Sequence, residues 1–402
     1  MKKPLSAAEW GIKMNNIKEL DKKYVANTYA RFPVLLEHGS GSLVYDDAGK
    51  EYIDLGAGIA VTSFGIADSE WAAAVTEQLT KLQHCSNLYF TGPCALLAEK
   101  LCELSGMKKV FFGNSGAEAN ECAIKTARKY SFDKYGPDRY KIVTLVDSFH
   151  GRTIATLSAT GQPDLQNGFQ PMVPGFIYTP ANDCEALKAL VESESGICAF
   201  MFELIQGESG VNVLTQEFVD CMVSLAKEHD ILLVDDEVQA GNGRTGTLYA
   251  YMQYGFTPDI MSTAKGLGGG LPIGACMLFE KCGGVFSYGD HGSTFGGNPV
   301  ICAGACSIIS RITDELLENV RKKGAYLMEQ LKKIEGVEEV SGMGLMIGIK
   351  TAKPAMEIAK KCIDKGLLVL TAHSKVRLLP PLTIGKDDID FALKILSEVI
   401  SG

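Results

Sequence analysis

A lysine and an acid that precedes it are the residues with the most specific chemical potential in this sequence. The apolar run 231–234 ends in Asp235 and Asp236, and Lys265 opens a glycine-rich stretch. A lysine amine forms a Schiff base with an aldehyde, and a carboxylate keeps a pyridine nitrogen protonated as an electron sink. The pair therefore indicates pyridoxal phosphate (PLP) chemistry. A solvated lysine and an ordinary acid at a strand end would explain the same residues without any chemistry.

A turn of small residues offers a site for an anion. Residues 111–120 read Phe-Phe-Gly-Asn-Ser-Gly-Ala-Glu-Ala-Asn, which predicts a strand, a turn and the start of a helix. Ser115, Gly116 and Ala117 leave a hydroxyl and backbone N–H groups open at the helix N-terminus, where the dipole also favours phosphate. An ordinary serine N-cap followed by Glu118 is the competing interpretation.

The segment after the predicted strand 141–146 carries an aromatic and a basic side chain. Phe149 can stack on a flat ring, and Arg152 can grip a carboxylate through its forked guanidinium. A core phenylalanine and a solvated arginine are the alternatives. We expect His150 to be structural, because no second ligand lies at metal spacing, and we predict no metal site.

Two acids and a distant arginine form a third group of candidates. Glu203 and Glu208 follow the predicted strand 198–202, and Arg377 stands among apolar residues near the C-terminus. Two acids near one strand end can serve as general acid and base. An arginine in such a strand usually has a partner, and Glu208 is a candidate for it. The glycine-rich loop 291–299 either approaches a ligand or is a simple connector.

Length and composition are typical of a globular protein with two domains. The 402 residues exceed the usual size of one core, and 46% of them are hydrophobic. The net charge of −9 argues against nucleic-acid binding, which needs basic surface. The sequence shows no signal-peptide core at its N-terminus, no apolar run of membrane-spanning length and no CxxC pair among its 12 cysteines. We therefore expect a cytoplasmic location, reduced cysteines and no membrane partner.

Short apolar runs alternate with helix-length segments in the middle of the chain. The expected strands are 110–112, 141–146, 198–202, 231–234 and 260–262, and the expected helices are 117–130, 183–194 and 216–229. This order predicts an α/β fold with a mostly parallel sheet that is covered by helices. Such sheets bind ligands at the carboxyl ends of their strands, where the candidate residues fall.

The pattern changes after Pro299 and predicts a smaller α+β domain. We expect helices at 300–312 and 314–334, a strand-like stretch at 337–350, a further helix after it, a strand pair at 367–370 and 376–379, and a last helix from 386. Residues 1–50, with a hairpin-like stretch at 41–52, are expected to pack with this domain. We therefore divide the chain into an N-terminal segment (1–50), a large cofactor-binding domain (51–298) and a C-terminal small domain (299–402).

Together these motifs resemble the class III (subgroup II) PLP-dependent aminotransferases of fold type I. The resemblance extends from about residue 27 to beyond Arg377, and its strongest parts are 111–120, 149–152, 231–246, Lys265 and the loop 291–299. It is closest to members that move the ω-amino group of N2-acetyl-L-ornithine to 2-oxoglutarate in arginine biosynthesis. Ornithine, 4-aminobutyrate and N-succinyl-diaminopimelate are the alternative donors.

The resemblance implies a role for each candidate at the cofactor. Lys265 would form the Schiff base and move the proton, and Asp236 rather than Asp235 would pair with the pyridinium nitrogen. The remaining cofactor contacts would be Ser115, Gly116 and Ala117 at the phosphate, Phe149 on the ring, Gln239 at the phenolic oxygen, and Thr294 from the neighbouring subunit at the phosphate. The resemblance therefore implies a homodimer with active sites at the subunit interface.

The resemblance also implies how the enzyme would handle two substrates. Arg377 would bind the α-carboxylate of glutamate and 2-oxoglutarate, and Glu208 would pair with Arg377 when the ω-amine donor is bound. The residues implied for the donor are Arg152, Tyr29 and Ser293. The sequence departs from the family at 65–70, where a histidine-containing motif is common, and at Leu204, where proline is usual; Asp235 also adds a second acid.

Overall fold

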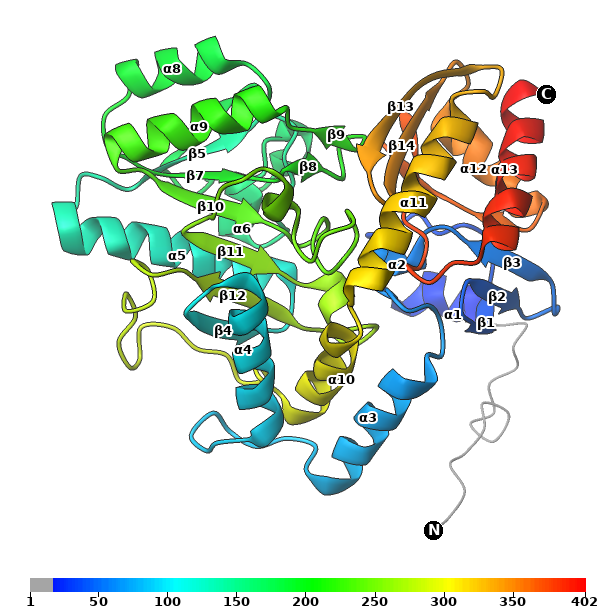
Figure 1. Cartoon of the computed structure of the whole chain (residues 1–402), viewed down its shortest axis with the longest axis horizontal. Coiled ribbons are helices and arrows are strands. Elements are labelled where there is room, and N and C mark those ends of the chain that lie inside the picture. Colours follow the sequence, from blue (N-terminus) through cyan, green and yellow to red (C-terminus); the bar gives the residue numbers. More distant parts are fainter. Residues whose placement is uncertain (1–16) are drawn as a thin grey trace.

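The computed structural model describes residues 17–402 and is built around a seven-stranded sheet (Figure 1). The strand order is β4-β12-β11-β10-β7-β5-β6, and only β12 runs opposite to the others. The bounds are β4 Lys109–Gly113, β5 Lys141–Leu145, β6 Phe176–Thr179, β7 Ile197–Phe202, β10 Leu232–Asp236, β11 Ile260–Thr263 and β12 Gly274–Leu278. The prediction of a mostly parallel sheet is confirmed.

Helices cover both faces of this sheet, so its strands are buried on both sides. Every residue of β7 is buried, which explains why the strands read as continuous apolar runs rather than alternating ones. Alternate residues of each strand point to opposite faces. One face packs against α5 (Gly116–Tyr135), and the other packs against α4 (Gly92–Ser105), α8 (Cys184–Ser193), α9 (Gln216–His229) and α10 (Pro299–Ser310).

Both ends of the described chain contribute to a second group of sheets. One sheet has the order β1-β2-β3-β15 and the other the order β13-β14-β17-β16. The bounds are β1 Leu36–Ser40, β2 Leu43–Asp46, β3 Glu51–Asp54, β13 Val337–Met343, β14 Met346–Thr351, β15 Leu367–Leu368, β16 Leu370–Ala372 and β17 Lys375–Leu378. Helices α11 (Asp314–Leu331), α12 (Ala355–Asp364) and α13 (Lys386–Ser401) pack on them around one apolar cluster that includes Ile53 and Leu55.

Two expectations for this region need correction. The strand-like stretch 337–350 is a hairpin of β13 and β14, which turns at Gly344, a residue with φ of +57°. The expected pairing of 367–370 with 376–379 is divided, because β15 joins β3 in parallel while only β16 pairs with β17. The sheet that holds β3 therefore contains strands from both ends of the sequence.

Short elements complete the described chain. They are α1 Ile17–Tyr24, α2 Ala57–Ala60, α3 Ser69–Lys81, α6 Ile154–Ala159, α7 Pro163–Gln166, β8 Ile205–Gln206, β9 Asn212–Val213, and the 3₁₀ helices Ala250–Gln253 and Lys265–Leu267. Residues 1–16, on which the expectation about a signal peptide rested, lie outside the described part of the chain. Within residues 17–402, no helix has the length and apolar character needed to cross a membrane.

Candidate active site

A cavity of about 460 Å³ lies at the carboxyl ends of the central strands. Its walls come from the segments that follow β4, β5, β10 and β11, which are far apart in sequence but end at one edge of the sheet. The predicted residues that line it are Ser115, Gly116, Ala117, Phe149, Arg152, Asp236, Gln239 and Lys265. The structure therefore brings the predicted lysine, acid, aromatic and small-residue turn into one space.

The small-residue turn is the N-terminus of the long helix α5. Ser115 is the N-cap, and its Oγ accepts a hydrogen bond of 3.2 Å from the backbone N–H of Glu118. Close packing holds the turn: a Cβ on Gly116 would lie 2.7 Å from Cγ1 of Val238, and a Cβ on Gly274 would overlap the backbone of Ser115. First-turn N–H groups have no acceptor within the helix, so this end of the cavity suits an anion.

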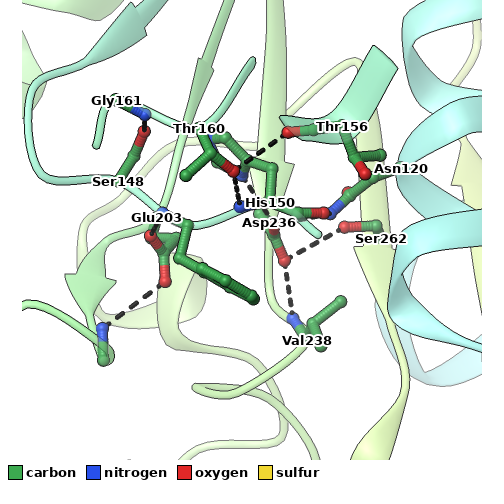
Figure 2. A network of polar contacts seen from close by, with 12 residues as sticks. Asn120, Ser148, His150, Thr156, Thr160, Gly161, Glu203, Asp236, Val238 and Ser262 are labelled. Atoms are coloured by element: carbon green, nitrogen blue, oxygen red, sulfur yellow. Dashed lines mark hydrogen bonds and ion pairs between the residues drawn. The ribbon is translucent and has the colours of Figure 1, made fainter. Parts of the chain in front are cut away.

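Asp236 is the last residue of β10 and presents a buried carboxylate to the cavity (Figure 2). Its Oδ2 lies 2.7 Å from Nδ1 of His150 and accepts a 2.7 Å hydrogen bond from Nδ2 of Asn120. Its Oδ1 accepts from the backbone N–H of Val238 at 3.1 Å and from Oγ of Ser262 at 3.3 Å. Four contacts fix the orientation of this carboxylate, as an electrostatic partner for a cationic ring requires.

Asp235 occupies the other side of β10 and does not line the cavity. Burial, followed by the charges of Glu237 and Asp236, raises the pKa of Asp235 well above its usual value. Burial also raises the pKa of Glu237 to about 7. Successive residues of a strand face opposite sides, so Asp235 and Glu237 share one environment and Asp236 has another.

Lys265 follows β11 and has a backbone φ of +44°, which side-chain-bearing residues rarely adopt. Burial lowers the pKa of its amine. Within residues 17–402 its Nζ forms no ion pair that would hold it in the charged state. The lysine is therefore set at the cavity with an amine that gives up its proton more readily than a solvated lysine.

Arg377, which is buried, and Glu208, which is partly buried, form an ion pair next to the cavity. The two guanidinium nitrogens of Arg377 reach the two carboxylate oxygens of Glu208 at 2.7 and 3.1 Å. Arg377 also donates to Oε1 of Gln239 and to the carbonyl of Gly207, each at 3.0 Å, while Nε2 of Gln239 donates to Glu208 at 3.1 Å. Burial alone would raise the pKa of Glu208, but Arg377 holds it below its usual value. Gln239 links this pair to the cavity.

Comparison with known proteins assigns the family. The model of the family described as aminotransferase class-III matches residues 24–400. The chain belongs to the class III aminotransferases. It is 47% identical over 389 residues to an acetylornithine aminotransferase of Haemophilus ducreyi, which covers 96% of this chain and 99% of that protein. An acetylornithine aminotransferase of Caldanaerobacter subterraneus is 48% identical over 388 residues, with coverage of 95% and 98%.

Solved aminotransferase structures share the whole fold. An ornithine aminotransferase from Toxoplasma gondii has a TM-score of 0.94 at 31% identity and covers 100% of this chain and 99% of its own. An N-acetylornithine aminotransferase from Stenotrophomonas maltophilia has a TM-score of 0.83 at 36% identity, with coverage of 95% and 98%. The predicted family and the predicted fold type I architecture are therefore confirmed.

Besides Arg377 and Glu208, which lie next to the cavity, three predicted residues of the aminotransferase do not line the cavity of their own chain. Tyr29 is 72% exposed and lies under the guanidinium of Arg31. Thr294 is exposed, while Oγ of Ser293 accepts a 3.2 Å hydrogen bond from Asn114, a residue of the cavity wall. The roles of these three residues stay predictions.

The departures from the family pattern also lie away from the cavity. Gly65 packs against Gly41, and Asp68 caps α3 and forms an ion pair of 2.7 Å with Arg311. Leu204 is fully buried in the apolar core. Of residues 65–70 and Leu204, none lines the cavity within the described chain, so they do not alter its walls.

Two polar residues of the aminotransferase site were not identified as functional from the sequence. His150 was expected to be structural, yet it contacts Asp236 with a fully buried ring. Asn120 lies one helical turn into α5 and donates both to Asp236 and to the carbonyl of His150, at 2.7 and 2.8 Å. Asn120 could have been recognised in the sequence as a polar residue on the buried side of the helix that follows the small-residue turn. A buried polar side chain needs a hydrogen-bond partner.

Proposed function

We propose that this aminotransferase moves the ω-amino group of N2-acetyl-L-ornithine to 2-oxoglutarate, giving N-acetylglutamate 5-semialdehyde and L-glutamate, with PLP as its cofactor. The names of its relatives support this donor. The observation that carries the proposal is the ion pair of Arg377 and Glu208 beside the cavity, at 2.7 Å. An enzyme that accepts both glutamate and an ω-amine needs an arginine with two alternative partners. Glutamate would pair with this arginine through its carboxylate, and a protein carboxylate would pair with it while the ω-amine is bound.

The chemistry of the cavity lining suits PLP. A phosphate matches the N-terminus of α5 at Ser115–Ala117, and a flat ring matches the wall formed by Phe149. Asp236 would meet the ring nitrogen, and Lys265 would hold the cofactor covalently. PLP supplies an aldehyde that accepts the amino group and a ring that withdraws electrons from the reacting carbon. A related structure supports this assignment, since the ornithine aminotransferase of Toxoplasma gondii has been solved with PLP in partial occupancy at its active site.

Lys265 is the group that we assign to proton transfer. Its Nζ would take a proton from the amine-bearing carbon of the substrate and return it later. A base must be largely unprotonated at working pH, and burial lowers the pKa of this lysine in that direction. Lys265 lines the same cavity as Asp236 and Gln239, so its amine can act on a substrate that is bound there.

Asp236 would face the ring nitrogen with a carboxylate whose direction is fixed by its contacts. The hydrogen bond from Asn120 and the contact with His150 occupy Oδ2, while Val238 and Ser262 occupy Oδ1. Such contacts stabilise a carboxylate and fix its direction. This is the role that the family resemblance implied for Asp236 rather than for Asp235.

The pair of Arg377 and Glu208 would select the substrate in each half-reaction. The α-carboxylate of glutamate would displace Glu208 and take the forked guanidinium. The ω-amine donor would leave the pair closed, so that Arg377 is never buried without a counter-charge. Arg152 would meet the donor's carboxylate; it lies on the cavity wall with its guanidinium 5.4 Å from the ring centre of Phe149. Tyr29 and Ser293 would complete the donor site.

We also propose a homodimer in which each subunit completes the site of the other. Leu88, Tyr89 and Phe90 are 86%, 71% and 106% exposed, and Phe295 is 58% exposed. Consecutive large apolar side chains on a surface mark an interaction site. Phe295 directly follows Thr294, the residue implied at the partner's phosphate. A second copy that covers these side chains would bring Thr294 toward a neighbouring cavity.

Half-reaction kinetics test the proposed function. The PLP-loaded protein is mixed with one amine at a time, and the change in cofactor absorbance gives kcat/KM for N2-acetyl-L-ornithine, ornithine, 4-aminobutyrate and N-succinyl-diaminopimelate. We expect the first to be the best donor. A preference of more than about tenfold, or about 1.4 kcal/mol, for 4-aminobutyrate would refute the donor assignment.

A second measurement tests the lysine. Borohydride reduction should attach PLP to Lys265 of the native protein and to no residue of Lys265→Ala, as read by peptide mass. Attachment elsewhere, or a native protein that takes up no PLP, would refute the cofactor assignment.

A further inference from the structure

Glu203 is a buried acid to which the proposed reaction assigns no part. It directly follows β7, lines the cavity and is only 5% exposed. Within residues 17–402 it is in no ion pair, although the charges of Asp236 and Lys265 both act on it. A buried acid that is in no ion pair costs free energy, so its presence calls for a physical reason.

The carboxyl group of Glu203 accepts hydrogen bonds from two separate chain segments (Figure 2). Oε2 accepts from the backbone N–H of Phe149 at 2.8 Å. Oε1 accepts from the backbone N–H of Gly207 at a longer 3.4 Å. One side chain therefore contacts the turn after β5 and the turn after β8.

Each of the two turns carries a different part of the site. Phe149 forms the flat wall of the cavity. Gly207 precedes Glu208, and its carbonyl accepts the 3.0 Å hydrogen bond from Arg377. A Cβ on residue 207 would overlap the amide of Gln239, so the backbone of Gly207 also supports that side chain. Glu203 thus lies between the wall that would cover the cofactor ring and the turn that holds the arginine pair.

We propose that Glu203 is a positioning residue that fastens the Phe149 turn to the Gly207 turn, and so sets the cofactor wall relative to the pair of Arg377 and Glu208. The proposal rests on the proposed function for its consequences in the reaction. The fastening itself is a property of the protein without cofactor.

Burial and the negative charge of Asp236 raise the pKa of Glu203 well above its usual value, while the N–H groups of Phe149 and Gly207 act in the opposite direction. These two donors, together with the positive charge of Lys265, compensate for placing an acid here. Glu203→Gln tests these two hydrogen bonds, because the glutamine amide nitrogen is a donor. It must therefore face the N–H group of either Phe149 or Gly207 without accepting its hydrogen bond.

Amide hydrogen exchange of the cofactor-free protein tests the fastening directly. Glu203→Gln should speed exchange at Phe149, Gly207 or both by about tenfold or more, since a lost hydrogen bond leaves a buried N–H without an acceptor. Asp259→Asn is the matched control, because Oδ2 of Asp259 accepts the N–H of Leu233 at 2.9 Å outside the cavity. The control should affect Leu233 and leave the two turns unchanged.

The loaded enzyme gives a second readout. Circular dichroism of bound PLP reports the setting of the ring, and we expect Glu203→Gln to change it while Asp259→Asn does not. We also expect Glu203→Gln to lower kcat in both half-reactions. If Glu203→Gln does not fold, Glu203→Asp, which keeps the charge but shortens the side chain by one methylene, takes its place in both measurements.

The outcomes separate this inference from the proposed function. Unchanged exchange at Phe149 and Gly207 in the variant would overturn the fastening, whatever the activity. Faster exchange with unchanged circular dichroism and kinetics would overturn the link to the cofactor wall. A native protein that binds no PLP would instead refute the proposed function and leave the exchange result standing.

Discussion

Removal of the carboxylate of Glu208 should affect the two half-reactions unequally. Glu208→Ala leaves Arg377, whose side chain is only 3% exposed, with the carbonyl of Gly207 and the amide of Gln239 as its described acceptors. While the cavity is open, water can replace the lost carboxylate. The ω-amine donor excludes this water without supplying a counter-charge, whereas glutamate supplies one.

The size of the effect follows from the burial of the pair. Loss of one partner of a buried ion pair costs about 3–5 kcal/mol. Glu208 is 27% exposed, so water lowers this cost, and we take about 2 kcal/mol for the donor complex. At about 1.4 kcal/mol per factor of ten, kcat/KM for N2-acetyl-L-ornithine should fall about 30-fold. Glutamate no longer has to displace Glu208, so its kcat/KM should stay unchanged or rise.

Single-turnover absorbance of the bound cofactor measures both values in one preparation. Glu339→Ala is the control, because Glu339 on β13 pairs at 2.8 Å with Lys375, which lies on the same strand as Arg377, and Glu339 does not line the cavity. We expect this control to change neither half-reaction by more than about twofold, because Glu339 is 51% exposed and water can replace its contact with Lys375. Equal losses in the two half-reactions of Glu208→Ala would show that Glu208 supports the fold of the site rather than the choice of substrate.

Three further predictions concern the cavity, the core and the surface. Gly274→Ala should raise the Kd for PLP by about tenfold or more in a fluorescence titration, because its Cβ would overlap the backbone of Ser115; an unchanged Kd would contradict the phosphate assignment. Asp235→Asn should gain thermal stability relative to the native protein as pH rises from 4.5 to about 7, by roughly 2–4 °C for each kcal/mol relieved. Burial raises the pKa of both Asp235 and Glu237, the latter to about 7, so ionisation of these acids over this pH range destabilises the native fold. A difference in Tm that does not depend on pH would contradict this. Phe90→Glu should dissociate the proposed dimer in light scattering and lower activity; an unchanged mass would remove Phe90 from the interface.

Local patterns in the sequence were sufficient for the main elements of the fold. Apolar runs of strand length that alternate with helix-length segments predicted β7, β10 and β11 and the helices between them, because strands covered on both faces cannot carry polar residues in their centres. The same alternation placed Ser115, Phe149 and Lys265 at strand ends. Carboxyl ends of parallel strands meet at one edge, so their approach to one another followed from the fold class.

The pairing of strands near the C-terminus depended on the tertiary structure. Residues 367–378 have the pattern of a simple strand pair, but β15 leaves to join β3 from the other end of the chain. A short apolar strand fits either neighbour locally. The choice is made by the apolar cluster that Ile53 and Leu367 share, and such a cluster is not visible in a local pattern.

The sequence by itself determined the chemistry that the chain offers: a lysine, an acid, an anion-binding turn and an arginine in need of a partner. Only the tertiary structure decided which groups meet. It turned Asp236 toward the cavity and Asp235 away from it, and it placed Glu208 against Arg377, which lies 169 residues further along the chain. Residue types and backbone periodicity are local properties, whereas a hydrogen bond to a distant partner depends on how all intervening elements pack.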